Sequence, residues 1–174
     1  MKINIIIATL VVIIGGILTF GHISSQKEGD STDVVKDETE SLIEQQLKTP
    51  ELIPEISWNL LYKYDYQNST GPDDLMALDG KLVKIPGYIV PLTDDYTQLD
   101  EFLLVPDAQS CIHVPPPPPN LIVAVTLREP VPMEEVYNPS WIYGIFKIEE
   151  SYSIHGGSSY KMDAVKIEKF VYEY

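Results

Sequence analysis

Cysteine and basic residues are scarce in this chain of 174 residues. Cys111 is the single cysteine, so an intramolecular disulfide is excluded and the folded part must depend on its hydrophobic core. The chain has 12 lysines and arginines against 26 aspartates and glutamates, which gives a formal net charge of −14. Because binding to a phosphate backbone requires clustered basic residues, we do not expect nucleic acid as a partner.

Charge is absent from residues 3–20, which read INIIIATLVVIIGGILTF and follow Lys2. A helix of this length spans about 27 Å, which is enough for the hydrocarbon core of a bilayer. Residues 1–21 are therefore predicted to be a signal peptide or a retained membrane anchor, with Lys2 on the cytoplasmic side. We expect the rest of the chain in the cell envelope, either in the periplasm or on the outer face of the inner membrane.

Apolar residues are few between positions 22 and 55, where acidic residues dominate. Such a composition buries too little surface to fold alone and predicts a flexible acidic tether. Glutamate, glutamine and leucine over residues 38–47 favour a short helix, and Pro50 and Pro54 end any helix there. The folded domain is predicted to cover residues 56–174.

Long helical stripes are missing after Ile56. Short β-branched and aromatic runs separated by turn residues instead predict five strands, over residues 82–92, 101–105, 121–127, 141–148 and 164–172. Gly87 and Gly144 inside two of these runs predict bends in the strands. The alternation of Tyr62, Tyr64 and Tyr66 predicts an extra edge strand.

This pattern indicates an all-β fold, namely a small five-stranded OB-like Greek-key barrel preceded by the hydrophobic helix and the tether. The alternative is an open β-sandwich. The bends that Gly87 and Gly144 predict are those that a tightly coiled barrel requires.

Cys111 and His113 are the candidate metal ligands of this chain. In an extended backbone, residues i and i+2 point the same way, so a thiolate and an imidazole would face one spot and form a two-ligand bite for zinc or copper. The five prolines at 115–119 predict a stiff polyproline II strut about 15 Å long. That strut could hold the two ligands in place, shield a sheet edge, or dock onto a partner.

Two ligands do not complete a zinc site, which usually has four. His155 is the other histidine of the predicted domain and is the next candidate ligand. Spacing does not choose among the carboxylate candidates, which are Glu101, Asp107, Glu134 and Glu135.

The alternative interpretation makes Cys111 a small buried apolar residue, with His113 hydrogen-bonded in a loop. Redox or nucleophilic chemistry at Cys111 ranks last, because a nucleophile requires a positioned base. We therefore predict no catalytic residue.

Several motifs together resemble the bacterial family DUF3299, and the resemblance covers residues 58–172. They are LDGK at 78–81, IPGY at 85–88, EFLLVP at 101–106, CIHVPPPPPN at 111–120, WIYG at 141–144 and YKMDA at 160–164. The family signature falls on Cys111, His113 and Asn120. The resemblance implies an OB-like fold and a secreted or lipid-anchored periplasmic protein. This chain lacks a lipoprotein cysteine, so anchoring would depend on the apolar helix.

Some members of this family are encoded beside ABC-type transport systems and zinc-responsive periplasmic proteins, and the resemblance therefore implies a part in zinc handling. We expect an exported, membrane-associated accessory module that binds zinc and assists an ABC-type transporter. The alternative is a periplasmic interaction adaptor that uses the polyproline segment without a metal. A thiol-dependent enzyme is the third hypothesis.

Overall fold

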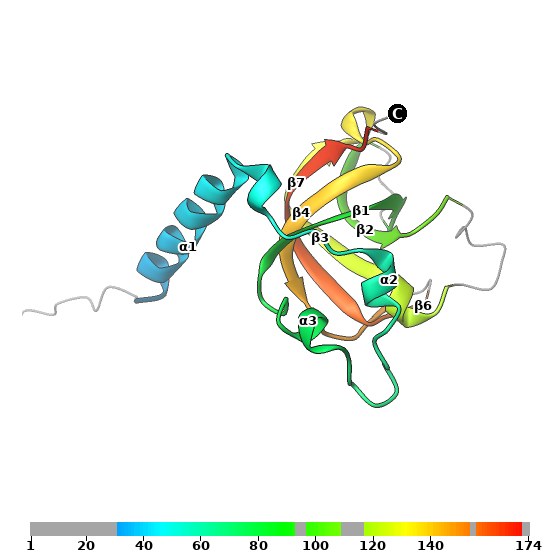
Figure 1. Cartoon of the computed structure of the whole chain (residues 1–174). Coiled ribbons are helices and arrows are strands. Elements are labelled where there is room, and N and C mark those ends of the chain that lie inside the picture. The colour runs from blue at the N-terminus through cyan, green and yellow to red at the C-terminus, as the bar shows by residue number, and fades with distance from the viewer. Residues whose placement is uncertain (1–30, 93–96, 109–116, 154–155, 172–174) are drawn as a thin grey trace, which may run out of the picture.

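The computed structural model describes residues 31–92, 97–108, 117–153 and 156–171 (Figure 1). Helical elements come first along the chain, and strands with short 3-10 turns follow. The helical elements are α1 (Ser31–Leu47), η1 (Pro50–Leu52), α2 (Trp58–Leu61) and α3 (Asp73–Met76). The strands and turns are β1 (Leu82–Pro91), β2 (Gln98–Val105), η2 (Pro119–Leu121), β3 (Val123–Pro132), η3 (Met133–Glu135), β4 (Ser140–Lys147), β5 (Ser151–Ser153), β6 (Gly156–Ser158) and β7 (Tyr160–Lys169).

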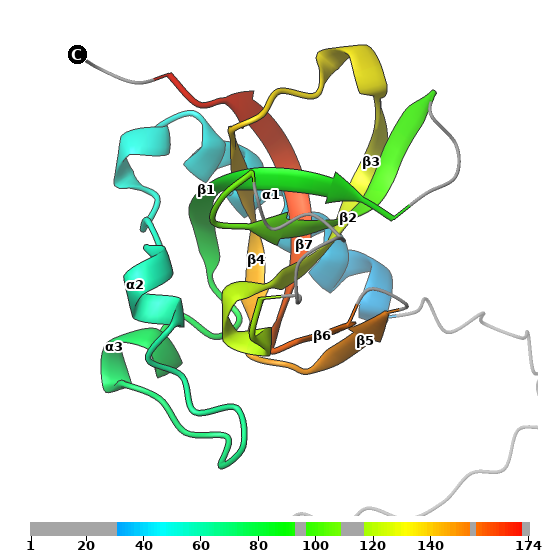
Figure 2. The same ribbon diagram turned by 90° about the vertical axis from the view of Figure 1, so that its right-hand side faces the viewer.

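Five of these strands form a closed barrel in the order β1-β2-β3-β7-β4, and β1 pairs with β4 to complete the ring (Figure 2). Four of the strand pairs are antiparallel, whereas β3 and β7 are parallel. The remaining two strands, β5 and β6, form a separate hairpin. The structure is thus a mostly β protein with a closed mixed barrel and short N-terminal helices, and it is not an open sandwich.

All five predicted barrel strands are present, as β1, β2, β3, β4 and β7. The predicted edge strand at Tyr62, Tyr64 and Tyr66 is wrong. Helix α2, which Ser57 caps by accepting a hydrogen bond from the backbone N–H of Leu60, has Tyr62 as its C-cap residue in an αR conformation. Asp65 then accepts hydrogen bonds from the backbone N–H groups of Gln67 and Asn68, so turns replace the expected strand.

Large side chains fill the barrel, with Phe102, Phe146 and Tyr160 completely buried. Gly144 lies at a register shift between β4 and β7, and a Cβ atom there would lie 2.6 Å from the carbonyl oxygen of Asp163. At Gly87 a Cβ atom would lie 2.8 Å from the carbonyl oxygen of Val105. Both glycines therefore permit close approach of neighbouring strands, and Gly144 marks a bulge in the barrel.

Helix α1 begins at Ser31, well before the short helix that the sequence predicts. Ile43 on α1 and Ile53 after η1 are buried in a cluster with Leu82 and Tyr143, on the outer face of β1 and β4. The division of the chain near residues 21 and 55 stays a prediction. Within the described ranges no helix is long and apolar enough to cross a membrane, and residues 3–20 lie outside those ranges.

Candidate functional site

The predicted metal ligands Cys111, His113 and His155 lie outside the described residues. The structure does describe the elements on either side of them. Strand β2 and the turn η2 flank the segment that contains Cys111 and His113, and β5 and β6 flank His155. The candidate site is therefore built from these flanking elements.

The β5–β6 hairpin lies over β2 and β3, the two barrel strands that the cysteine-containing segment connects. Residues of all four elements line one hollow of about 180 Å³. Its lining residues are Leu92, Glu101, Leu103, Ala124, Val125, Thr126, Ser151, Tyr152, Gly156 and Ser158. Gly156, which directly follows His155, is thus placed against the β2–β3 face.

Asn120 fixes the C-terminal end of the proline run. Its Nδ2 atom donates hydrogen bonds to the backbone oxygens of Tyr62 at 2.8 Å and Tyr64 at 3.0 Å, and the side chain is buried. Both carbonyl groups belong to the turn after α2, so Asn120 ties η2 to the helical region. Asn120, one of the three residues of the family signature, is thus a structural anchor.

A second contact fixes the same end of the run. The backbone N–H of Ser159 donates to the carbonyl oxygen of Pro119 at 2.9 Å, which holds the end of β6 against η2. Asn120 Oδ1 and Ser159 Oγ are buried and have no hydrogen-bond partner among the described residues. Strand β6, which follows His155 in the sequence, and the turn η2, which follows the proline run, are therefore neighbours.

The three tyrosines that were predicted as an edge strand border a shallow hollow of about 370 Å³. Pro118 and Asn120 line its other side. Pro118, near the end of the proline run, thus shares this hollow with the three tyrosines. The alternating tyrosines therefore mark residues that line a shared hollow, and they do not mark a strand.

The carboxylate candidates are not equivalent in the structure. Glu101 lines the β2–β3 hollow together with Gly156, whereas Glu134 and Glu135 lie in η3 and do not line it. Asp107 is exposed just after β2. Among the described residues no three His, Cys, Asp or Glu side chains converge as a metal site would require.

The β5–β6 hairpin is a structural element that the sequence prediction missed. Gly156 and Gly157, directly after His155, are the first two residues of β6, and adjacent glycines near a strand end are a turn signal that could have revealed the hairpin. Tyr152 on β5 is 80% exposed beside the hollow, and its hydroxyl donates to Glu150 Oε2 at 3.0 Å.

Two buried tyrosines have altered acidity. Burial raises the pKa of Tyr160, whose hydroxyl donates to the carbonyl oxygen of Leu61 at 2.7 Å. Burial, together with a hydrogen bond to Glu168, raises the pKa of Tyr143 to about 12. A hydrogen bond from Lys166 lowers the pKa of Glu168. These groups stabilise the barrel and lie away from the β2–β3 hollow.

The fold and this surface define a small β-barrel protein with N-terminal helices and a hairpin over one barrel face. The family model described as "Protein of unknown function (DUF3299)" matches residues 33–169, and the chain belongs to this family. A crystal structure of a DUF3299 family protein from Pseudomonas aeruginosa PAO1 is similar, with 35% identity and a TM-score of 0.56. The match covers 70% of this chain and 99% of that chain. No curated protein matches the chain.

Proposed function

We propose that this chain is an exported, membrane-associated accessory module that binds zinc through Cys111 and His113 and assists an ABC-type transporter. The observation that carries the proposal is the position of the β5–β6 hairpin over β2 and β3. In the sequence His155 lies between β5 and β6, and Cys111 and His113 lie between β2 and η2. A zinc site needs at least one protein ligand besides the Cys-x-His pair, and a second segment such as the one that contains His155 would supply it.

Chain lengths are compatible with such a site. His113 lies four residues before Pro117, so its Cα atom is at most about 14 Å from that of Pro117. His155 is four residues before Ser159, which is hydrogen-bonded to Pro119. Glu101 is the carboxylate that the same hollow offers as a further ligand.

The barrel is proposed to be of the OB type. Five strands, the meander β1–β2–β3 and the parallel pairing of β3 with β7 support this assignment. OB-folds bind ligands on the face of their second and third strands, flanked by the loops after the first and fourth strands. The hollow lies on that face here, and β5–β6 is the connection after the fourth barrel strand, β4.

Zinc uptake by the purified full-length chain tests the proposal. Equilibrium dialysis at micromolar zinc is expected to show one bound ion, and a Cys111→Ser, His113→Ala double variant is expected to bind at least about tenfold more weakly. Ser110→Ala is the matched control and should bind as the parent does. Affinity should fall as the pH is lowered, because the thiol and the imidazole must lose their protons. Absence of zinc uptake, or equal uptake by parent and double variant, would contradict the proposal.

The adaptor hypothesis has one observation in its favour, since Pro118 is exposed beside the tyrosine-lined hollow. However, Pro119 and Asn120 are committed to contacts within the chain. Replacement of prolines 115–118 by alanine separates the two functions. Loss of partner co-purification with unchanged zinc binding would favour the adaptor.

A further inference from the structure

The pairing that closes the barrel between β3 and β7 covers only part of the two strands. The two strands pair only from Val123 with Tyr160 to Leu127 with Ala164. Beyond this point β7 pairs with β4 alone, from Lys166 to Lys169, and β3 pairs with β2 again at Val131. Two strand edges therefore face one another without a strand between them, within the part of the chain that the structure describes.

The edge of β7 has backbone groups available for pairing. The N–H of Phe170 donates to Pro139 beside β4, and alternation along an antiparallel strand directs the N–H groups of Glu168 and Lys166 the same way. The N–H groups of Ile167 and Lys169 then point away from β4, toward the unpaired part of β3. The facing edge of β3 contains Pro130 and Pro132, which have no N–H to donate.

A groove of about 760 Å³ lies along the unpaired part of the two strands, between α1 and the barrel. Its floor is apolar, because Leu127, Val131 and Ile167 belong to or pack against the barrel core. Ile43 and Leu47 of α1 form one wall. An extended chain with alternating side chains fits a channel with a strand edge along one side and apolar residues below.

The rim of the groove is acidic. Four carboxylates line it, against the two cations Arg128 and Lys166. Arg128 is paired with Asp163 at 2.9 Å, and Lys166 is paired with Glu168 at 3.0 Å.

The other three rim carboxylates, Glu40, Glu44 and Glu129, have no ion-pair partner among the described side chains. A cationic occupant would complement them. A second copy of this chain, with its net charge of −14, would be repelled.

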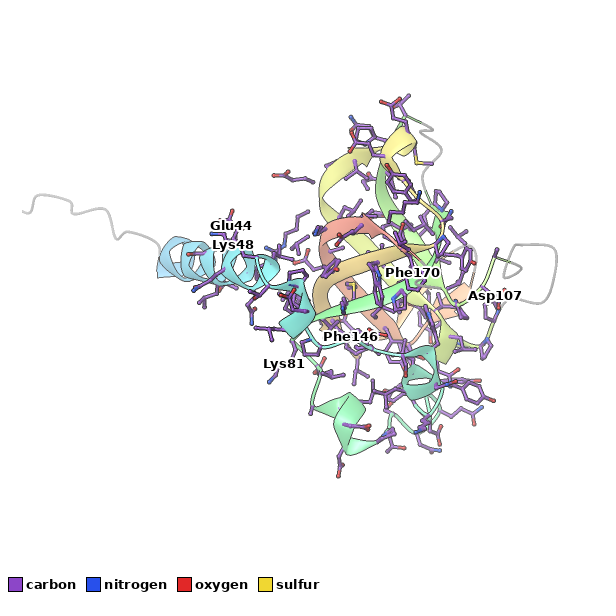
Figure 3. All side chains as sticks on the ribbon, turned by 45° about the horizontal axis from the view of Figure 1, so that its top comes forward. Glu44, Lys48, Lys81, Asp107, Phe146 and Phe170 are labelled. Atoms are coloured by element: carbon purple, nitrogen blue, oxygen red, sulfur yellow. The ribbon has the colours of Figure 1, made fainter. Side chains whose placement is uncertain are left out.

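We propose that this groove receives an extended, basic segment of a partner protein, which adds a strand to the β7 edge. The site is independent of the proposed zinc site. In the views of Figures 1 and 3, α1 with Glu44 projects from one side of the barrel and Asp107 at the end of β2 lies on the other. The partner's main chain would supply the affinity, and its basic side chains would meet Glu40, Glu44 and Glu129.

Hydrogen exchange on the full-length chain tests the proposal with a synthetic peptide, acetyl-Lys-Val-Lys-Val-Lys-amide. The amides of Ile167 and Lys169 are expected to exchange quickly alone and to become protected when the peptide binds. A peptide N-methylated on one alternate set of residues should lose binding, and a peptide methylated on the other set should retain it. Absence of protection up to about 1 mM peptide, or equal binding of both methylated peptides, would overturn the proposal.

Charge reversal supplies the second arm. The triple variant Glu40→Lys, Glu44→Lys, Glu129→Lys should bind the basic peptide about tenfold more weakly. The matched control Glu51→Lys, Glu134→Lys, Glu135→Lys changes the net charge equally at exposed positions outside the groove. Equal weakening in both triples would show general charge attraction and overturn the proposal. Protection that appears without peptide as protein concentration rises would assign the edge to a second copy and overturn it too.

Discussion

Asn120 Nδ2 donates a hydrogen bond of 3.0 Å to the carbonyl oxygen of Tyr64, across 56 residues of sequence. A second bond from the same atom, to the oxygen of Tyr62, makes this side chain the bridge between η2 and the turn after α2. The bridge fixes one end of the segment that carries Cys111 and His113. Its energetic weight can be measured directly.

Asn120→Ala should lower the free energy of unfolding by about 2–3 kcal/mol, because the buried carbonyl group of Tyr64 and the part-buried carbonyl group of Tyr62 lose their donor. Urea denaturation monitored by tryptophan fluorescence measures the change. Asn68→Ala is the control, since Asn68 bonds Asp65 at 2.8 Å on the exposed surface, and about 0.5 kcal/mol is expected there. An Asn120→Ala effect no larger than that of the control would contradict the anchoring role.

Gly144→Ala should destabilise the barrel by about 1–3 kcal/mol, because the added Cβ atom would lie 2.6 Å from a backbone oxygen of β7. Backbone atoms in a barrel cannot move aside as a surface side chain can. Gly157→Ala is the control, since its nearest neighbour is the exposed ring of Tyr152 at 3.2 Å, and the cost should stay below about 1 kcal/mol. Similar midpoints of thermal unfolding for the two variants would show that the close approach is not limiting.

Stability should decline above pH 10 because of the buried tyrosines. A tyrosine whose folded-state pKa is raised stabilises the fold fully below its unfolded pKa of 10.0, and that stability is lost as the pH rises toward the folded value. For Tyr143 the folded value is about 12, so its contribution is lost between pH 10 and about 12.

Urea midpoints at several alkaline pH values measure the decline. Tyr143→Phe and Tyr160→Phe should flatten it, whereas Tyr62→Phe, which alters an exposed ring, should not. A decline that is equally steep in all three variants would contradict the assignment.

The barrel was predictable because the burial of its strands is visible in the sequence. Phe102 and Leu104 on β2 pack in the barrel core, whereas Leu103 and Val105 pack in a second, outer cluster. A strand that is buried on both faces reads as a short apolar run bounded by turn residues, and the sequence shows such runs. The turns over residues 62–68 were not predictable in this way, because local side-chain hydrogen bonds at Asp65 determine them against the tyrosine pattern.

The candidate site was only partly predictable, for a related reason. Cys111 and His113 indicate metal binding, but the hairpin proposed to complete their site begins at Ser151, 40 residues after Cys111. Spacing could not rank Glu101 above Glu134, because that ranking depends on which strands the hairpin covers. Long-range placement is the information that local periodicity lacks.

Helix α1 should detach from the barrel when Ile43 is truncated. Ile43 is 5% exposed and packs in the outer cluster with Leu82 and Tyr143, and an isolated helix of this length is marginal in water. In Ile43→Ala the amides of α1 should exchange markedly faster while those of β4 keep their protection. The adjacent Leu42→Ala is the control, because Leu42 is 61% exposed. Unchanged protection in Ile43→Ala would mean that other contacts hold the helix.

Glu101→Gln and His155→Ala should each weaken zinc binding by about 10- to 100-fold if both complete the site with Cys111 and His113. The reason is positional, since Glu101 and the residue after His155 line one hollow over the strands that the Cys-x-His segment connects. Glu134→Gln removes an equal charge in η3, outside that hollow, and should leave the affinity unchanged. Competition against a chromophoric chelator measures all three dissociation constants. Equal, small losses in Glu101→Gln and Glu134→Gln would mean that the carboxylates act only through net charge, and the hollow would then not be part of the zinc site.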